Sequence, residues 1–334
     1  MADFDLSTVT AALAQNLSDE VIKTANRTSP LLAMVPAEQG EGKNVAWAYE
    51  TDAANAENFS DGADVSSYAL DAPGFASLSW GLYRSNFKIT DLASSAAATS
   101  RTPRGLANAL ADNLMNSARK LASGLNAVGY SGAGTGTTIA GLATALRDDN
   151  TYAGVDRTSV SAMRAKVIDP GSSTAVTLAL IRSDLSSIFD ACGEHCDLAM
   201  CSTAVWNSIA ALFTEIRRIN QNVDAMGRVV LDGSADELVI DKCRFIKDKD
   251  ATANAIYYLN TNYLRWQTLP FVGTSEQDVI ATLPLQTGMG TAGVSASVVR
   301  LARTGAAAKF TLMTQCQLVV KKPIAMGKRL NVAA

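Results

Sequence analysis

A long polar segment without helical or strand periodicity separates two strand-like segments, and it constrains the fold more than any other feature. It spans Thr51–Ser67 and reads TDAANAENFSDGADVSS. Its flanks, Val45–Tyr49 and Leu78–Tyr83, alternate large apolar residues with small ones, as half-buried strands do. A connection of about 25 residues is uncommon in a compact domain and is usually functional or mobile. We therefore expect a two-stranded hairpin with a long polar tip.

The hairpin lacks a core of its own, whereas the chain as a whole has ample apolar material. Phe59, Tyr68 and Phe75 are the only aromatic residues of the connection. The 334 residues are 48% hydrophobic and 18% charged, with a formal net charge of -3, which suits an ordered protein of about two domains. The hairpin is therefore expected to pack on something outside itself.

Composition excludes several classes of protein. The longest apolar runs, such as Ala175–Ile181, are far shorter than the roughly 20 residues that a membrane span needs. The N-terminus MADFDLSTVT has no signal-peptide pattern. The five cysteines have no paired spacing, which favours reduced thiols in a cytosol over a disulfide framework.

The small net charge hides two segregated runs. Between Glu50 and Asp71 there are six acidic residues and no basic one. From Arg300 to the end there are seven basic residues and no acidic one: Arg300, Arg303, Lys309, Lys321, Lys322, Lys328 and Arg329. Such runs are solvated faces about as often as they are binding surfaces, so charge alone leaves both interpretations open.

One long helix is predicted over residues 103–128. Thr102 can cap it, Pro103 suits its first turn, and leucine or another apolar residue recurs every three or four positions. Gly129 is a natural stop for it. At this length the helix would span roughly 39 Å, which is long for a compact domain.

The middle of the chain has an α/β pattern. It predicts a helix at Leu178–Cys192, a strand at Asp197–Cys201 and a helix at Ala204–Ile219 capped by Ser202. Extended segments follow at 228–233, 237–248 and 255–269, and a last set of strands lies at 294–303 and 309–323. A further short helix is expected at Asp19–Asn26.

No pattern in the chain predicts catalysis or a cofactor. Cys192, His195, Cys196 and Cys201 are of the right types for zinc, but their spacing is wrong and His195 is the only histidine. Buried structural cysteines and a surface histidine explain them better. The glycine-rich Gly129–Leu142 lacks the Lys-Ser/Thr of a phosphate loop. We predict no catalytic, cofactor or metal residues.

The order of these parts resembles that of the tailed-bacteriophage major capsid proteins, which have the Hong Kong-type capsid fold. The resemblance covers nearly the whole chain and rests on loose matches in the same order rather than on one motif. The matching segments are Gly141–Ser159, Cys196–Ile209 and Cys243–Trp266, the last with the turn Tyr258–Asn260.

The resemblance implies an α+β fold in five parts. These are an N-terminal arm at 1–44, an extended β-hairpin loop at 45–84, a peripheral domain at 85–166 with a spine helix at 103–128, an axial α/β domain at 167–284, and a closing β segment at 285–334. In that family the extended loop lies across a neighbouring subunit, where strand edges and charges find partners.

It further implies a shell protein that assembles in the host cytoplasm and becomes part of the virion. The partners implied are copies of itself in hexamers and pentamers, a separate scaffolding protein, a portal, a decoration protein and packaged double-stranded DNA. Lys321, Lys322, Lys328 and Arg329 are candidates for DNA contact. Two alternatives stay open: an encapsulin-type compartment, and a soluble cysteine- or metal-dependent enzyme.

The two charge runs suggest where subunits contact each other. The hypothesis pairs acidic and aromatic residues of the hairpin tip with basic residues of a neighbour's C-terminal strands. The candidates are Glu57, Asp61, Asp64, Phe59 and Tyr68 on one side, and Arg300, Lys309, Lys321 and Lys322 on the other. Exposed pairs contribute roughly 0–1 kcal/mol each, so their effect would come from repetition.

Overall fold

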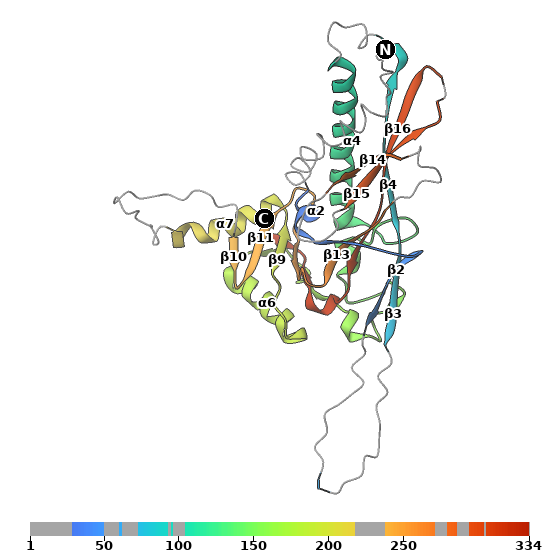
Figure 1. Ribbon diagram of the computed structural model, residues 1–334. Coiled ribbons are helices and arrows are strands. Elements are labelled where there is room, and N and C mark those ends of the chain that lie inside the picture. Colours follow the sequence, from blue (N-terminus) through green and yellow to red (C-terminus); the bar gives the residue numbers. More distant parts are fainter. Residues whose placement is uncertain are drawn as a thin grey trace.

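The computed structural model is a mixed helix and sheet fold, as the sequence predicts (Figure 1). It describes residues 29–49, 60–61, 73–92, 95, 104–217, 238–270, 279–285, 294–303 and 305–333. The helices are α2 (Pro30–Met34), α4 (Arg104–Ser131), α5 (Leu142–Ala145), α6 (Leu178–Cys192) and α7 (Thr203–Arg217), with 3-10 turns at Ser161–Met163 and Pro323–Ala325. No helix in these ranges is long and apolar enough to cross a membrane.

The first sheet is organised around one long strand, β16. Its strands are β1 (Ala37–Gln39), β4 (Gly81–Thr90), β13 (Leu264–Leu269), β14 (Val279–Pro284), β15 (Ser295–Leu301) and β16 (Ala307–Val320). One edge of β16 pairs with β4, and the other pairs first with β15 and then with β13. Figure 1 shows α4 running alongside β4 and β16, and Phe87 of β4 stacks on Phe310 of β16, with ring centroids 5.2 Å apart.

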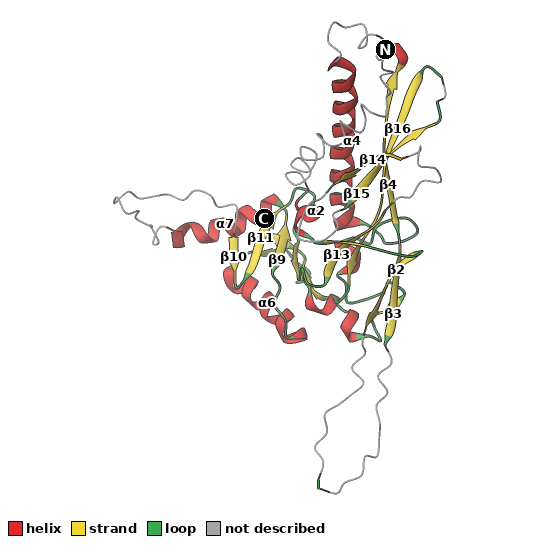
Figure 2. Ribbon diagram, viewed as in Figure 1, coloured by secondary structure: helices red, strands yellow, loops and turns green. Residues whose placement is uncertain are grey.

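The hydrophobic cluster around the first sheet is called the first core. The second sheet lies between this core on one face and the helices α6 and α7 on the other (Figure 2). Its strands are β7 (Lys166–Ile168), β9 (Leu198–Cys201), β10 (Leu238–Ile240), β11 (Cys243–Lys247), β12 (Ile256–Leu259) and β17 (Gly327–Arg329). Side chains alternate across each strand, so Met200 and Tyr257 face the first core while Cys201 and Tyr258 face α6 and α7.

Three smaller strand pairs complete the fold. They are β2 (Asn44–Tyr49) with β3 (Gly74–Ser79), β5 (Thr151–Tyr152) with β6 (Val155–Asp156), and β8 (Thr174–Ala175) with β18 (Val332–Ala333). The antiparallel β2–β3 pair confirms the predicted hairpin and its first strand, with Val45 opposite Leu78. The second strand is Gly74–Ser79 instead of the predicted Leu78–Tyr83.

The long predicted helix exists as α4, but Gly129 does not end it. The helix continues to Ser131. The reason is a tertiary contact: a Cβ at Gly129 would lie 2.7 Å from Cδ2 of Leu31 and 3.4 Å from Cζ2 of Trp266. Gly129 therefore permits the close approach of α2 and β13 to the helix. The helix ends at the residues that follow it.

The second strand of the hairpin is interrupted, where the sequence predicts one strand over Leu78–Tyr83. The chain leaves β2 at Ser79 and pairs with β16 from Gly81 onward. Trp80 lies at the break and donates from its indole Nε1 to the carbonyl oxygen of Gly42 at 3.1 Å. A Cβ at Gly81 would lie 2.6 Å from Ile139 and 2.8 Å from the Cys316 oxygen, so the change of partner requires glycine there.

The described residues of the predicted N-terminal arm pack into the core of the same chain. Leu31 and Leu32 of α2 are buried, and β1 extends the first sheet in parallel with β13. The predicted helix at Asp19–Asn26 and the predicted strand at 228–233 lie outside the described residues.

In the middle of the chain the predicted helices are confirmed closely, whereas the extended segments predicted at 237–248 and 255–269 each contain a turn and form two strands. Helix α6 has the predicted bounds: Thr177 Oγ1 accepts from Leu180 N at its start, and Gly193 ends it in the left-handed conformation. Helix α7 covers the predicted helix up to Arg217, and its last two predicted residues lie outside the described ones. Ser202 Oγ accepts a 3.5 Å hydrogen bond from Val205 N at its start.

Candidate functional site

The base of the hairpin is held by a few specific contacts. On its inner face Val45, Ala76 and Leu78 are buried, and Trp47 lies 6.1 Å from Tyr152 between ring centroids. Ser77 N donates to Ala153 O at 2.8 Å. The outer face carries small residues and Phe75, whose side chain is 75% exposed. The base is therefore fixed, while one large apolar side chain is left facing solvent.

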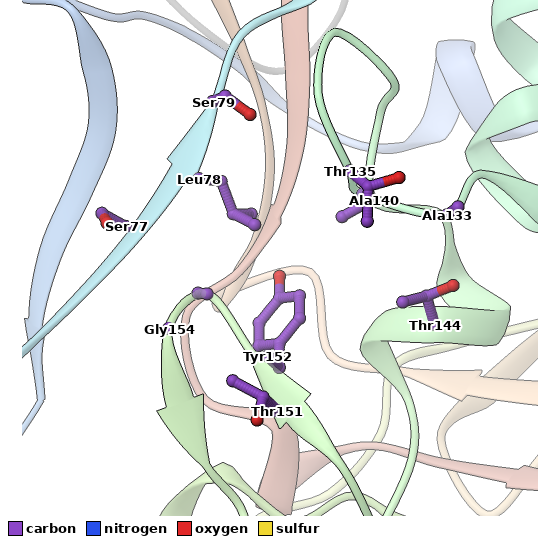
Figure 3. Close-up of a pocket in the computed structure, with 12 residues that line it drawn as sticks. Ser77, Leu78, Ser79, Ala133, Thr135, Ala140, Thr144, Thr151, Tyr152 and Gly154 are labelled. Atoms are coloured by element: carbon purple, nitrogen blue, oxygen red, sulfur yellow. The ribbon is translucent and has the colours of Figure 1, made fainter.

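A cavity of about 270 Å³ lies beneath the hairpin base, between β3, the glycine-rich loop and the β5–β6 turn (Figure 3). Its lining is small and mostly polar: Ser77, Leu78, Ser79, Ala133, Gly134, Thr135, Ala140, Thr144, Thr151, Tyr152, Ala153 and Gly154. Burial raises the pKa of Tyr152 to about 12, and its hydroxyl oxygen accepts from Val320 N. The lining side chains include no carboxylate, imidazole or amine.

The glycine-rich loop supports the hairpin. Ser79 Oγ donates to Gly136 O at 2.6 Å, and Leu82 N donates to Thr137 O at 3.0 Å. Gln317 of β16 bonds to both the hairpin and the glycine-rich loop: its Nε2 donates to Ser79 O, and its Oε1 accepts from Ala140 N. The loop thus carries a structural contact at the point where the chain changes from one strand pair to the next.

Of the predicted acidic and aromatic tip residues, the structure describes Asp61, which is exposed. Glu57, Phe59, Asp64 and Tyr68 lie outside the described residues. The predicted pairing of this tip with a neighbour therefore remains a hypothesis.

The predicted basic residues do not form one surface. Arg300 is opposite Phe310, and Lys309 is opposite Leu301, so Arg300 and Lys309 lie on opposite faces of the sheet. Lys321 lies about 40 Å from Lys309 along the chain direction, at roughly 3.3 Å per strand residue.

Lys321 and Lys322 already have acidic partners within the chain. Lys321 Nζ lies 3.2 Å from Glu38, and Lys322 Nζ lies 2.7 Å from Glu194. Burial acts to raise the pKa of Glu38, but Lys321 and Arg265 outweigh it and leave the pKa below its ordinary value. The hydrogen bond from Lys322 lowers the pKa of Glu194, and the same bond raises that of Lys322.

Sequence reasoning missed two basic residues that share a face with Lys309. Lys88 of β4 is exposed and directly opposite Lys309, and exposed Arg84 lies on the same face of the strand. The signal was present as alternation, because residues 84, 86 and 88 are all polar in a strand-like segment. Like charges directly opposite each other on a sheet are unfavourable unless an anion lies nearby.

Comparison with known proteins places this geometry in a family. The family model described as SU10 major capsid protein matches residues 3–333. The chain belongs to the SU10 major capsid protein family. No curated protein matches the sequence.

Solved capsid structures share the fold of this capsid protein at low sequence identity. The capsid of cyanophage A-1(L) is 18% identical, with a TM-score of 0.70 over 92% of this chain and 93% of that chain. A structure of Mycobacterium phage Bobi is 12% identical, with a TM-score of 0.55 over 92% and 91%. The SrpI encapsulin of Synechococcus elongatus is 12% identical, with a TM-score of 0.50 over 89% and 85%.

Family membership settles the general function. The protein is a major capsid protein of a phage head, a component of the virion whose copies associate into a shell. The encapsulin alternative is weaker, because the family model is that of a phage protein and the encapsulin match has the lower TM-score.

The cysteines of this capsid protein lie mostly in its cores. Cys196, Cys201, Cys243 and Cys316 are buried, and burial raises the pKa of Cys196, Cys201 and Cys316 to about 12. His195 is exposed and stacks on Phe189 at 4.5 Å between ring centroids. In the part of the chain that the structure describes, no three His, Cys, Asp or Glu residues are grouped as metal ligands.

The hypothesis that Lys328 and Arg329 contact DNA is wrong for this fold. Both residues lie in β17 and are buried, 7% and 8% exposed. Lys328 Nζ donates to Ala143 O at 3.0 Å, and Arg329 forms a two-bond ion pair with Asp184. These cations stabilise the subunit from inside and are not available to a phosphate backbone.

Proposed function

We propose that the protein forms an icosahedral shell of hexamers and pentamers around double-stranded DNA, and that it has no enzymatic activity. The observation that carries this proposal is the capsid family match over residues 3–333. A scaffolding protein and a portal would direct assembly in the host cytoplasm, and a decoration protein would bind the finished shell.

The proposed division of the subunit follows the two sheets. The first sheet with α4 would be the peripheral domain, the second sheet with α6 and α7 the axial domain, and the β2–β3 hairpin the extended loop. This division differs from the expected ranges, because β13 and β14 of 167–284 belong to the first sheet and β17 of 285–334 belongs to the second. The two hydrophobic clusters support this division, because one surrounds the first sheet and the other lies between the second sheet and its helices.

The shell itself can be tested with purified protein. Negative-stain electron microscopy and light scattering should show closed particles or rings, and particles from infected cells should protect DNA from nuclease. A 35.1 kDa species that stays monomeric with scaffolding protein present would contradict the proposal. Particles that hold protein cargo and no nucleic acid would favour the encapsulin alternative.

We further propose that Glu57, Asp61 and Asp64 of one subunit face the cationic strip of a neighbour. The cationic strip is Arg84, Lys88 and Lys309. Of the predicted basic residues, Lys309 lies directly opposite Lys88 and on the same face of the sheet as Arg84. Three cations therefore gather on one face, which suits an acidic partner.

Charge reversal tests this contact. Glu57→Lys/Asp61→Lys/Asp64→Lys should leave the subunit folded by circular dichroism but impair shell formation, and Lys88→Glu/Lys309→Glu in the same chain should restore it. Lys120→Glu/Lys166→Glu is the matched control, because both lysines are exposed and lie off the cationic strip. Normal assembly of the triple variant at low salt, where screening is weakest, would refute the contact.

A further inference from the structure

A small cluster of buried polar side chains lies at the seam between the two sheets. We call it the seam lock and define it as Asn126 and Tyr130 of α4 with Asp248, which follows β11. Asn126 and Tyr130 are four residues apart and therefore lie on the same helix face. All three side chains are buried, at 0%, 1% and 1% exposure.

The seam lock joins three separate parts of the chain. Asn126 Nδ2 lies 2.9 Å from Oδ2 of Asp248 and 2.8 Å from Oδ2 of Asp250. Its Oδ1 accepts from Leu31 N at 3.1 Å, so the same amide also caps the start of α2. Tyr130 Oη donates to Asp248 Oδ2 at 2.9 Å.

The carboxylate of Asp248 is held by neutral donors. Besides Asn126 and Tyr130 it accepts from Asp250 N at 3.0 Å, and among the described residues it forms no ion pair with a lysine or arginine. Burial, and then the charge of Asp248, raise the pKa of Tyr130 well above its ordinary value, so the phenol remains a donor. Asn126 and Tyr130 both donate to this carboxylate, so these hydrogen bonds form together in one arrangement of α4 and the segment after β11.

A buried network of this kind can specify one structure while adding little net stability. The apolar contacts around it, such as Tyr130 on Tyr257 at 5.6 Å between ring centroids, tolerate small rotations of one sheet against the other. Hydrogen bonds weaken steeply as their distance and angle depart from the ideal, so the seam lock does not tolerate such rotations.

We propose that the seam lock fixes the angle between the two sheets and thereby the uniformity of the shell. The second part rests on the shell proposed above. Every subunit repeats the same angle, so a spread in that angle produces a spread in the curvature between neighbours. Tyr130 and Asp248 are positioning residues, and both are buried within the subunit.

The angle can be measured on unassembled subunits with two spin labels. One label is placed at Arg84→Cys on the first sheet and the other at Val239→Cys on the second, both exposed positions, in a Cys192→Ser background. Pulsed electron paramagnetic resonance then gives the distribution of distances between the labels. Shell diameters are measured in parallel by electron microscopy of the unlabelled variants.

The variants are Tyr130→Phe and Asp248→Asn, and the matched control is Tyr257→Phe. Tyr257 is a buried tyrosine next to Tyr130, but its hydroxyl pairs with Thr252 Oγ1 at 2.7 Å instead of with the seam lock. We expect a single narrow distance in the wild type and the control, and loss of that single distance with mixed shell diameters in the two variants.

Unchanged distances in Tyr130→Phe and Asp248→Asn would overturn the proposal, whatever the shells look like. Broadened distances with uniform shells would overturn its second part. If Asp248→Asn does not unfold cooperatively, the milder Tyr130→Phe decides alone. If the wild type forms no shells, the proposed function fails, while the distance measurement still judges the seam lock.

Discussion

The buried ion pair between Arg329 of β17 and Asp184 of α6 gives the sharpest prediction for stability. Their side chains are 10% and 2% exposed, the guanidinium makes two hydrogen bonds to the carboxylate, and Tyr258 Oη donates to the same carboxylate at 3.0 Å. Arg329→Met keeps most of the aliphatic volume and removes the charge. It leaves Asp184 buried with Tyr258 as its remaining side-chain donor.

The expected cost follows from that geometry. Removing one partner of a buried ion pair costs about 3–5 kcal/mol, because the remaining charge stays desolvated. The hydrogen bond from Tyr258 keeps part of the stabilisation of Asp184, which places the expected loss near the lower end, at about 3 kcal/mol. Burial, and then the Asp184 charge, raise the pKa of Tyr258, so its hydroxyl stays protonated and continues to donate.

An exposed ion pair on α6, the helix that carries Asp184, provides a control for the effect of burial. Arg182 pairs with Asp241 at 3.3 Å, but these side chains are 57% and 49% exposed. Arg182→Met should therefore cost at most about 1 kcal/mol. Asp184→Leu/Arg329→Met should recover most of the loss of the single variant, because no buried charge is left.

Urea unfolding of unassembled subunits, followed by circular dichroism, measures these differences. Subunits must be kept unassembled, since association would add to the apparent stability. The slope with urea should be unchanged and only the midpoint should shift. Equal midpoints for Arg329→Met and Arg182→Met would refute the argument that burial makes the first pair different.

Three further outcomes are expected. Iodoacetamide at about pH 8.5 should label Cys192 in the native subunit and spare Cys196, Cys201 and Cys316, whose pKa values burial raises to about 12; equal labelling by mass spectrometry would contradict this. Tyr152→Phe should cost about 1–3 kcal/mol in urea unfolding, since Val320 N loses its acceptor; no change would show that another acceptor replaces it. Burial, and then Arg147 and Arg157, lower the pKa of Lys328 to about 8 in the folded subunit. Between pH 8 and about 10.5 the unfolded state therefore binds more protons than the folded state, and the free energy of unfolding rises with pH. Lys328→Met should remove that rise, and an unchanged pH profile would contradict this prediction.

Local signals explain what could be predicted from the sequence. Helix α6 was placed correctly because its limits, at Thr177 and Gly193, act within one turn of the residues that they cap. The sequence predicts the end of α4 too early and does not predict the break at Trp80, because distant residues set both. Gly129 is required by Leu31, and Gly81 by Ile139 and Cys316, none of which is its neighbour in sequence.

The contact surface shows the same limit more strongly. The seven basic residues near the C-terminus do not form one basic surface. Alternate side chains of a strand point to opposite faces, and the fourteen residues of β16 keep the residues at its two ends far apart. Lys321 and Lys322 find acids at Glu38 and Glu194, while Lys328 and Arg329 point into the core. Lys309 shares one face of the sheet with Lys88 and Arg84, which come from a strand more than two hundred residues earlier. Only the register of β4 on β16 brings them together, so the surface that we propose for a neighbouring subunit is a product of topology rather than of the charge run.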